Sequence, residues 1–143
     1  MKKFLLLFVI MCSTLTLAQT KFEITPKEYW ITDDNFDEKI NNSSAFGDEE
    51  NRVVVVEFWA KFNQDNCFRE WKQLENVLYY RIDIAEGPIA KKKYRVRMAP
   101  TLIIFQDGTK FKVFKAGLDL ILKNDLEEIQ ESIDEANTAS QFE

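Results

Sequence analysis

The sequence of 143 residues contains no histidine, only two cysteines, four glycines and three prolines. Without histidine, neither a Ser-His-acid triad nor a histidine-bearing zinc site can form. Two cysteines are too few for a thiolate metal site, and no glycine lies in a GxGxxG or P-loop arrangement. The composition therefore predicts no cofactor, neither a metal ion nor a nucleotide, and it gives no signal for a hydrolase.

Basic residues are fewer than acidic ones, 19 against 24, for a formal net charge of -5. A charge of this sign argues against binding to nucleic acid or to an anionic membrane. Hydrophobic residues make up 45% of the chain and aromatic residues 13%, which is enough for a packed core. The length and composition predict one globular domain.

Residues 1–18 have the features of a secretory signal peptide. Lys2 and Lys3 precede an apolar run, 4–11, and the small residues that follow suit cleavage before Gln19. The run is too short to anchor the chain across a bilayer, so we expect no stable membrane insertion. We expect an exported protein, either periplasmic in a bacterium or secreted.

Cleavage would leave a domain at 19–137 and a short tail at 138–143. Cys12 offers a competing interpretation, a lipid-anchored protein, but bulky residues precede it where lipoprotein signals prefer small ones. Cleavage would remove Cys12 and leave Cys67 as the single cysteine, so no intramolecular disulfide could form. A disulfide-linked homodimer through Cys67 is a further alternative.

The pattern of apolar residues predicts alternating strands and helices. Strands are expected at 53–58, 78–84 and 101–105, with a short helix before the first, capped by Thr32 or Asp33, and another after Gly87. Asp107-Gly108 is typical of a two-residue hairpin. A last helix is expected to begin at a capping box of Asn124 and Glu127. These elements predict an α/β fold, a three-layer α/β/α sandwich with a central mixed sheet.

Four segments in this order resemble the thioredoxin family. "VVEFWAKF" is similar to the strand before the thioredoxin active site, and "DIAEGPIAKKKYRVRMAPT" to the family's next strand, helix and loop. "IIFQDGTK" is similar to its terminal hairpin, and "KAGLDLI" to the turn before its last helix. The resemblance implies a thioredoxin-like fold, a buried acid at Glu57 and a cis-proline at Pro100 that faces the active site.

The redox motif of the family is missing from this chain. Aligned without a gap, its two cysteine positions are Asn63 and Asn66, and one inserted residue would bring Cys67 to the second position. Thioredoxin chemistry needs one thiolate to attack a disulfide and a second thiol to resolve the product. Neither alignment supplies the pair, so the site is degenerate. Asn63 and Asn66 are predicted to cap the helix that follows.

Cys67 admits two interpretations. The expected helix after it carries Phe68, Trp71, Leu74 and Leu78 on one face, and Cys67 falls within that arc, which favours a buried structural residue. In the alternative, the thiol lies near a helix N-terminus, forms mixed disulfides and is catalytic, as in a monothiol redox protein.

Three other features carry charge. Glu57 lies in an apolar strand, so its pKa should be raised, and a hydrogen bond to a neighbour or to a lysine is expected. "KKKYRVR", 91–97, is most simply a solvated face, although it would attract an acidic peptide if it bordered a binding groove. The pairs Asp33-Asp34 and Glu49-Glu50 are expected to face solvent.

The sequence therefore predicts an exported, thioredoxin-like module that binds a protein or peptide partner without dithiol chemistry. The family resemblance implies a groove beside the cis-proline, in which an extended peptide adds to the backbone edge. The residues expected to line it are Trp59, Phe62, Asn63, Ala99, Pro100 and Thr101. The alternative function is thiol-disulfide exchange by Cys67, within the redox homeostasis that the family serves.

Overall fold

A computed structural model describes residues 25–41 and 53–140 of the protein. The predicted signal peptide, Cys12, the cleavage site before Gln19 and the Glu49-Glu50 pair lie outside the described residues. Within them, no helix is long and apolar enough to cross a membrane.

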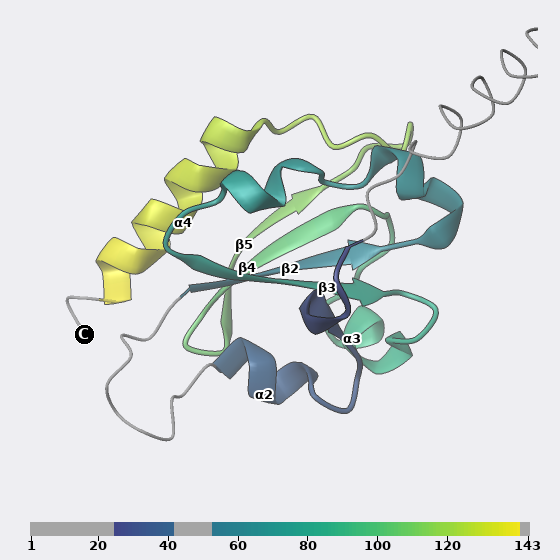
Figure 1. The fold of residues 1–143 in the computed structure, drawn as a ribbon, viewed down its shortest axis with the longest axis horizontal. Coiled ribbons are helices and arrows are strands. Elements are labelled where there is room, and N and C mark those ends of the chain that lie inside the picture. The colour runs from purple at the N-terminus through teal and green to yellow at the C-terminus, as the bar shows by residue number, and fades with distance from the viewer. Residues whose placement is uncertain (1–24, 42–52, 141–143) are drawn as a thin grey trace, which may run out of the picture.

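A five-stranded mixed sheet forms the centre of the domain (Figure 1). Its strand order is β1-β3-β2-β4-β5. The first three strands in this order run parallel, whereas β4 is antiparallel to both β2 and β5. The strand bounds are β1 Trp30–Ile31, β2 Val53–Trp59, β3 Val77–Asp83, β4 Thr101–Gln106 and β5 Thr109–Lys115. The mixed central sheet predicted from the sequence is confirmed.

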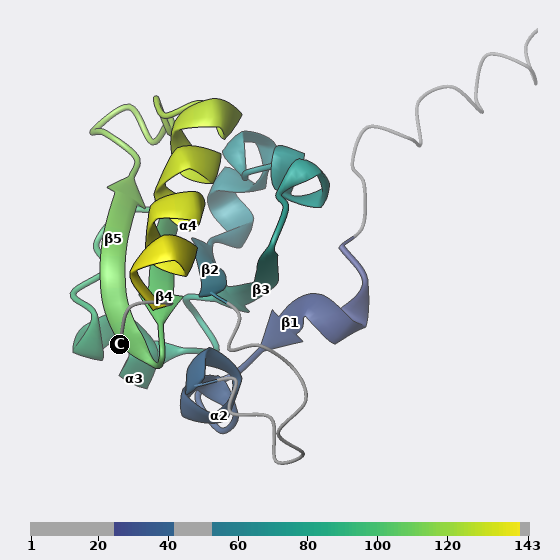
Figure 2. The same cartoon turned by 90° about the vertical axis from the view of Figure 1, so that its left-hand side faces the viewer.

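Helices cover both faces of this sheet, which gives three layers (Figures 1 and 2). One face carries α2, Phe36–Asn41, and α3, Pro88–Lys93. The other carries α4, Leu126–Ser140, and the 3-10 turns η2, Lys61–Asn66, and η3, Glu70–Gln73. A further 3-10 turn, η1 at Lys27–Tyr29, precedes β1. Each face of the sheet has its own apolar core, because successive side chains of β2 and β4 point to opposite sides.

The hairpin between β4 and β5 has the geometry that the sequence predicts. Asp107 and Gly108 both have positive φ angles, 49° and 74°, as a type I′ turn requires. This turn matches the twist of the flanking strands, so a local signal of two residues is enough to fix the pairing of β4 with β5.

The helix caps differ from those predicted. The side chain of Asn35, and not that of Thr32, lies at the start of α2, where it accepts a hydrogen bond from the Thr32 N–H. Asp33 caps α3 across space, accepting from the backbone N–H groups of Ile89 and Ala90, so it does not simply face solvent. A cap formed by a distant residue leaves no local pattern in the sequence.

The last helix also differs at both ends. Asp125, and not Asn124, accepts the hydrogen bond from the Glu128 N–H at its start. The helix then continues to Ser140, past the expected domain boundary at 137.

Residues 61–73 do not form the regular helix that the apolar spacing predicts. They form η2 and η3, with an extended residue, Cys67 (φ −64°, ψ 158°), at the end of η2. Phe68 and Trp71 are nevertheless buried against the sheet, and Leu78 belongs to β3. The hydrophobic pattern correctly identified Phe68 and Trp71 as buried, whereas Leu74 is only partly buried and Leu78 packs on the other face of the sheet, and the backbone between them is irregular.

Candidate functional site

Asn63 occupies the place where the family resemblance expects the attacking cysteine. Its side chain is buried, and its amide nitrogen donates hydrogen bonds to the backbone oxygens of Ala99, at 2.7 Å, and Leu120, at 2.8 Å. These two carbonyls belong to the loop before β4 and the loop before α4. Asn63 therefore ties three segments together that lie far apart in the sequence.

Asn66 completes this arrangement. Its side-chain amide donates to the Asn63 side-chain oxygen at 2.8 Å, so the two asparagines are in direct contact. No side chain caps η2 or η3. The prediction that these asparagines cap the following helix is wrong, because the amide of Asn63 binds distant carbonyls and no regular helix follows.

Exposed apolar residues lie next to Asn63 in the sequence, and next to its hydrogen-bond partner Leu120. Phe62 is 75% exposed, and Leu118 and Ile121, on either side of Leu120, are 92% and 48% exposed. We call Phe62, Leu118 and Ile121 the apolar rim. Of these three residues, only Phe62 was predicted from the sequence, although "KAGLDLI" places Leu118 and Ile121 in the turn on either side of Leu120.

The other predicted groove residues present little side-chain surface. The Ala99–Pro100 peptide bond is cis, and Ala99, Pro100 and Thr101 are all buried. The Thr101 hydroxyl donates to the Met98 carbonyl at 2.6 Å. Trp59 is half-buried and packs edge-to-face against Trp30, with ring centroids 5.0 Å apart. Of the six predicted residues, Phe62 alone offers a large exposed side chain.

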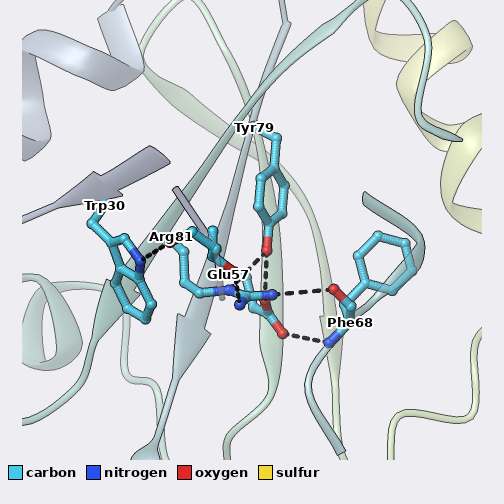
Figure 3. A network of polar contacts seen from close by, with 6 residues as sticks. Trp30, Glu57, Phe68, Tyr79 and Arg81 are labelled. Carbon is cyan, nitrogen blue, oxygen red and sulfur yellow. Dashed lines mark hydrogen bonds and ion pairs between the residues drawn. The ribbon is translucent and has the colours of Figure 1, made fainter. Parts of the chain in front are cut away.

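Glu57 lies at the centre of a buried polar network on the face of the sheet that α4 covers (Figure 3). Its carboxylate accepts hydrogen bonds from the Tyr79 hydroxyl at 2.5 Å, the Arg81 guanidinium at 2.7 Å and the Phe68 N–H at 2.7 Å. The parallel register places Glu57 beside Arg81. The side chains that bind the Glu57 carboxylate are therefore those of an arginine and a tyrosine, not the lysine considered from the sequence.

The alternation of β3 carried a signal for these partners. Tyr79 and Arg81 are two residues apart, so they point to the same face of the sheet. Arg81 is a charged residue on the buried face of β3, the strand next to Glu57, and this pattern would have predicted the ion pair between them. The register that pairs Glu57 with Arg81 depends on both strands, so it is not visible in the sequence of either strand alone.

Burial sets the direction of the pKa shifts of Glu57 and Tyr79 in this network, but not that of Arg81. It raises the pKa of Glu57, and the charge of Arg81 with the hydrogen bonds from Tyr79 and Phe68 offsets only part of that effect. The raised pKa expected for Glu57 is confirmed in direction. Burial also raises the pKa of Tyr79 well above its ordinary value, and the neighbouring carboxylate adds to this shift. Burial is the largest single influence on Arg81 and lowers its pKa, but the charge of Glu57 together with the charge of Tyr79 and its hydrogen bond outweighs burial, and the net shift of the pKa is upward.

The network explains why no helix forms after Cys67. The Phe68 N–H donates to Glu57, and the Phe68 carbonyl accepts from Arg81 at 3.2 Å. In a continuous helix these two backbone groups would pair with residues four positions away. The buried ion pair binds both groups instead, while the other end of the guanidinium donates to the Thr25 hydroxyl.

Cys67 is a half-exposed free thiol at the end of η2. It lies neither on the buried face of a helix nor at a helix N-terminus, so both helix-based arguments made from the sequence are wrong. Across 25–41 and 53–140, no cluster of acidic, cysteine or histidine side chains could hold a metal ion.

The basic segment 91–97 extends from α3 toward Pro100. Lys92, Lys93, Arg95 and Arg97 are exposed, and Lys91 is half-buried. Lys93 forms an ion pair of 3.1 Å with Asp37 of α2. Most of this segment is a solvated face, as the sequence analysis expected.

Glu57 gives a prediction about pH. Because its pKa is raised in the folded protein, the unfolded chain loses this proton first as pH rises above about 4.5. The contribution of Glu57 to stability should therefore fall with rising pH until the folded-state pKa is passed. We expect the free energy of unfolding of the unmodified protein to fall relative to that of Glu57→Gln between about pH 4 and pH 7, measured by urea unfolding.

The opposite slope would contradict this expectation. If the stability difference grows in favour of the unmodified protein as pH rises, the Arg81 charge exceeds the effect of burial and the Glu57 pKa is lowered. Asp37→Asn, an exposed carboxyl whose ion-pair partner Lys93 is also exposed, is the matched control and should leave the slope nearly unchanged.

The fold and this site together define a class of protein. A mixed five-stranded sheet between helical layers, with a turn after β2 that faces a cis-proline loop, is a thioredoxin-like domain. The model of the thioredoxin family matches residues 27–135. The chain belongs to the thioredoxin family.

Comparisons with individual proteins agree with this assignment. The chain is 33% identical to a thioredoxin of Staphylococcus epidermidis over 86 residues, which cover 54% of this chain and 73% of that one. It is 29% identical to the mouse endoplasmic reticulum resident protein 44 over 123 residues, 76% of this chain. The match covers only 28% of the mouse protein, so the chain corresponds to one part of it.

Solved structures show the same fold. The thioredoxin of Plasmodium falciparum superposes with a TM-score of 0.55 at 17% sequence identity, over 74% of this chain and 96% of that one. A designed protein superposes with a TM-score of 0.52 at 18% identity, over 79% of this chain and 95% of the design.

Proposed function

We propose that this protein is an exported thioredoxin-like module that binds an extended segment of a partner protein without dithiol chemistry. The observation that supports the proposal most strongly is the position of Asn63. At the place of an attacking thiol, its amide is buried and hydrogen-bonded to two backbone carbonyls. An amide held in this way supports a binding surface and offers no nucleophile for a disulfide.

The apolar rim supports a particular mode of binding. The side-chain amide of Asn63 already donates a hydrogen bond to the Ala99 carbonyl. An added peptide strand would need this carbonyl as an acceptor, so strand addition is less favourable here. Phe62, Leu118 and Ile121, which flank Asn63 and its partner Leu120 in the sequence, remain exposed. The partner is therefore held chiefly by apolar side chains that pack on the rim, a role for which aromatic residues are enriched at interfaces.

The test is a selection of peptides from a displayed library on the immobilised protein, followed by affinity measurements. We expect Phe62→Ala combined with Leu118→Ala to weaken the selected peptides at least about tenfold, since central apolar contacts carry most binding energy. Phe111→Ala, an exposed aromatic residue on β5 that is 38% exposed, is the matched control and should retain binding. Equal affinity in the rim variant would contradict the proposal.

A second candidate function is exchange by a single thiol, which the partial exposure of Cys67 favours. Cys67→Ser separates the two functions in the same experiment. If the apolar rim binds the partner, the serine variant keeps its affinity and neither protein reduces insulin. If capture depends on Cys67 and is reversed by dithiothreitol, the protein acts through a mixed disulfide instead.

A further inference from the structure

A pocket lies next to the apolar rim, at the carboxyl ends of two parallel strands. It has a volume of about 580 Å³. Its walls come from the end of β2 and start of η2, from the turn after β3, and from α3; the lining residues are Ala60, Lys61, Phe62, Asp83, Ile84, Ala85 and Lys91. The Ile84 N–H donates to the Trp59 carbonyl at 2.9 Å, which joins the two strand ends beneath it. Crevices at the carboxyl ends of parallel strands are common ligand sites in α/β folds. We call this the lysine pocket.

The charges of the lysine pocket favour an anion. Lys61 and Lys91 reach it from different elements, η2 and α3. The third charged residue, Asp83, uses one carboxylate oxygen to accept the Ala85 N–H at 2.9 Å, so it is held within its own turn. The pocket is positive in a chain whose formal net charge is -5, and the exposed cations of 92–97 continue from Lys91 along the same segment.

Phe62 links this pocket to the apolar rim. The same side chain lines the lysine pocket and is 75% exposed. A ligand that fills the pocket therefore meets two lysine side chains and an aromatic ring together. An extended peptide satisfies this arrangement when a carboxylate lies beside an apolar or aromatic side chain.

We propose that the lysine pocket selects an acidic segment of the partner, in which a glutamate or aspartate side chain lies between Lys61 and Lys91 and an adjacent apolar side chain packs on Phe62. This proposal rests on the proposed function and specifies the class of partner. Charge complementarity supports it, because two of the three charged residues that line the pocket are lysines, on a molecule whose formal net charge is -5.

The experiment uses two labelled synthetic peptides of twelve residues, one rich in glutamate and phenylalanine and one with every glutamate replaced by glutamine. We expect the acidic peptide to bind the unmodified protein at least about tenfold more tightly than its neutral copy, and less tightly as salt is raised. Lys61→Glu combined with Lys91→Glu should remove this preference. The control variant combines Lys110→Glu with Lys115→Glu, which change the net charge by the same amount at exposed positions of β5. This control should keep most of the preference for the acidic peptide.

Each outcome decides the proposal. Equal binding of both peptides, or equal binding by both double variants, overturns the acidic specificity and leaves the apolar rim as a binding surface. If neither peptide binds the unmodified protein, the acidic-apolar partner is wrong, and the library selection with the rim variant still tests the proposed function separately. If the protein self-associates in sedimentation and Lys61→Glu with Lys91→Glu abolishes this, the pocket binds a second copy of the chain, and the peptide partner is overturned.

Discussion

Replacing Arg81 with methionine is expected to lower the free energy of unfolding by about 3–5 kcal/mol. The guanidinium is almost fully buried and contacts Glu57, Thr25 and the Phe68 carbonyl. Its removal leaves the Glu57 carboxylate inside the protein without a compensating charge, and leaves the Phe68 carbonyl without this donor. Breaking one half of a buried ion pair destabilises far more than the pair itself stabilises. Urea unfolding at neutral pH, read from the midpoint and slope, measures the change.

The control is Arg97→Met, which removes the same charge from an exposed position and should change stability by less than about 0.5 kcal/mol. Combining Arg81→Met with Glu57→Leu should recover part of the lost free energy of unfolding. The double variant replaces the ion pair with two apolar side chains of similar volume, so no unpaired charge remains buried. If Arg81→Met lowers the free energy of unfolding no more than Arg97→Met does, the ion pair between Arg81 and Glu57 does not stabilise the folded protein.

Introducing two cysteines, Asn63→Cys and Asn66→Cys, is expected to create a disulfide and a new insulin-reducing activity. The Asn66 amide already donates to the Asn63 side-chain oxygen at 2.8 Å, so the two side chains are in contact although the backbone is kinked at Asn63 (φ −121°, ψ 25°) inside η2. The turn faces the cis-proline loop, where the family fold presents its thiols. Cys67→Ser is included in every variant, so that only the new pair can react. Thiol titration after mild oxidation and an insulin assay measure the result.

Reduced stability should accompany this gain of activity. The cysteine at position 63 cannot donate to the Ala99 and Leu120 carbonyls, and each lost hydrogen bond from a buried group costs about 1–3 kcal/mol. Asn63→Cys alone, in the same background, is the control: it loses the same hydrogen bonds but has no resolving thiol and should not turn over insulin. Two free thiols after oxidation of the double variant would show that the asparagine contact does not place the sulfur atoms for a bond.

Local patterns determined most of the secondary structure. The β-branched run of β2, the alternation of β3 and the Asp107-Gly108 turn each act over a few residues, so the strands and the hairpin form where the sequence predicts them. The order of four family-like segments then predicted the fold, which the family match and the solved structures confirm. The family resemblance of the sequence alone also implies that Asn63 and Asn66 stand where thioredoxins have cysteines.

The tertiary structure decided the site. A buried ion pair binds both backbone groups of Phe68, so the helix predicted from apolar spacing is replaced by two short turns. The amide of Asn63 reaches the Ala99 and Leu120 carbonyls, 36 and 57 residues away. Hydrogen bonds of this kind depend on where distant strands and loops meet, and no pattern of neighbouring residues encodes that meeting. Local propensity fixes the elements, while long-range polar contacts fix the backbone and the exposed surface at the site.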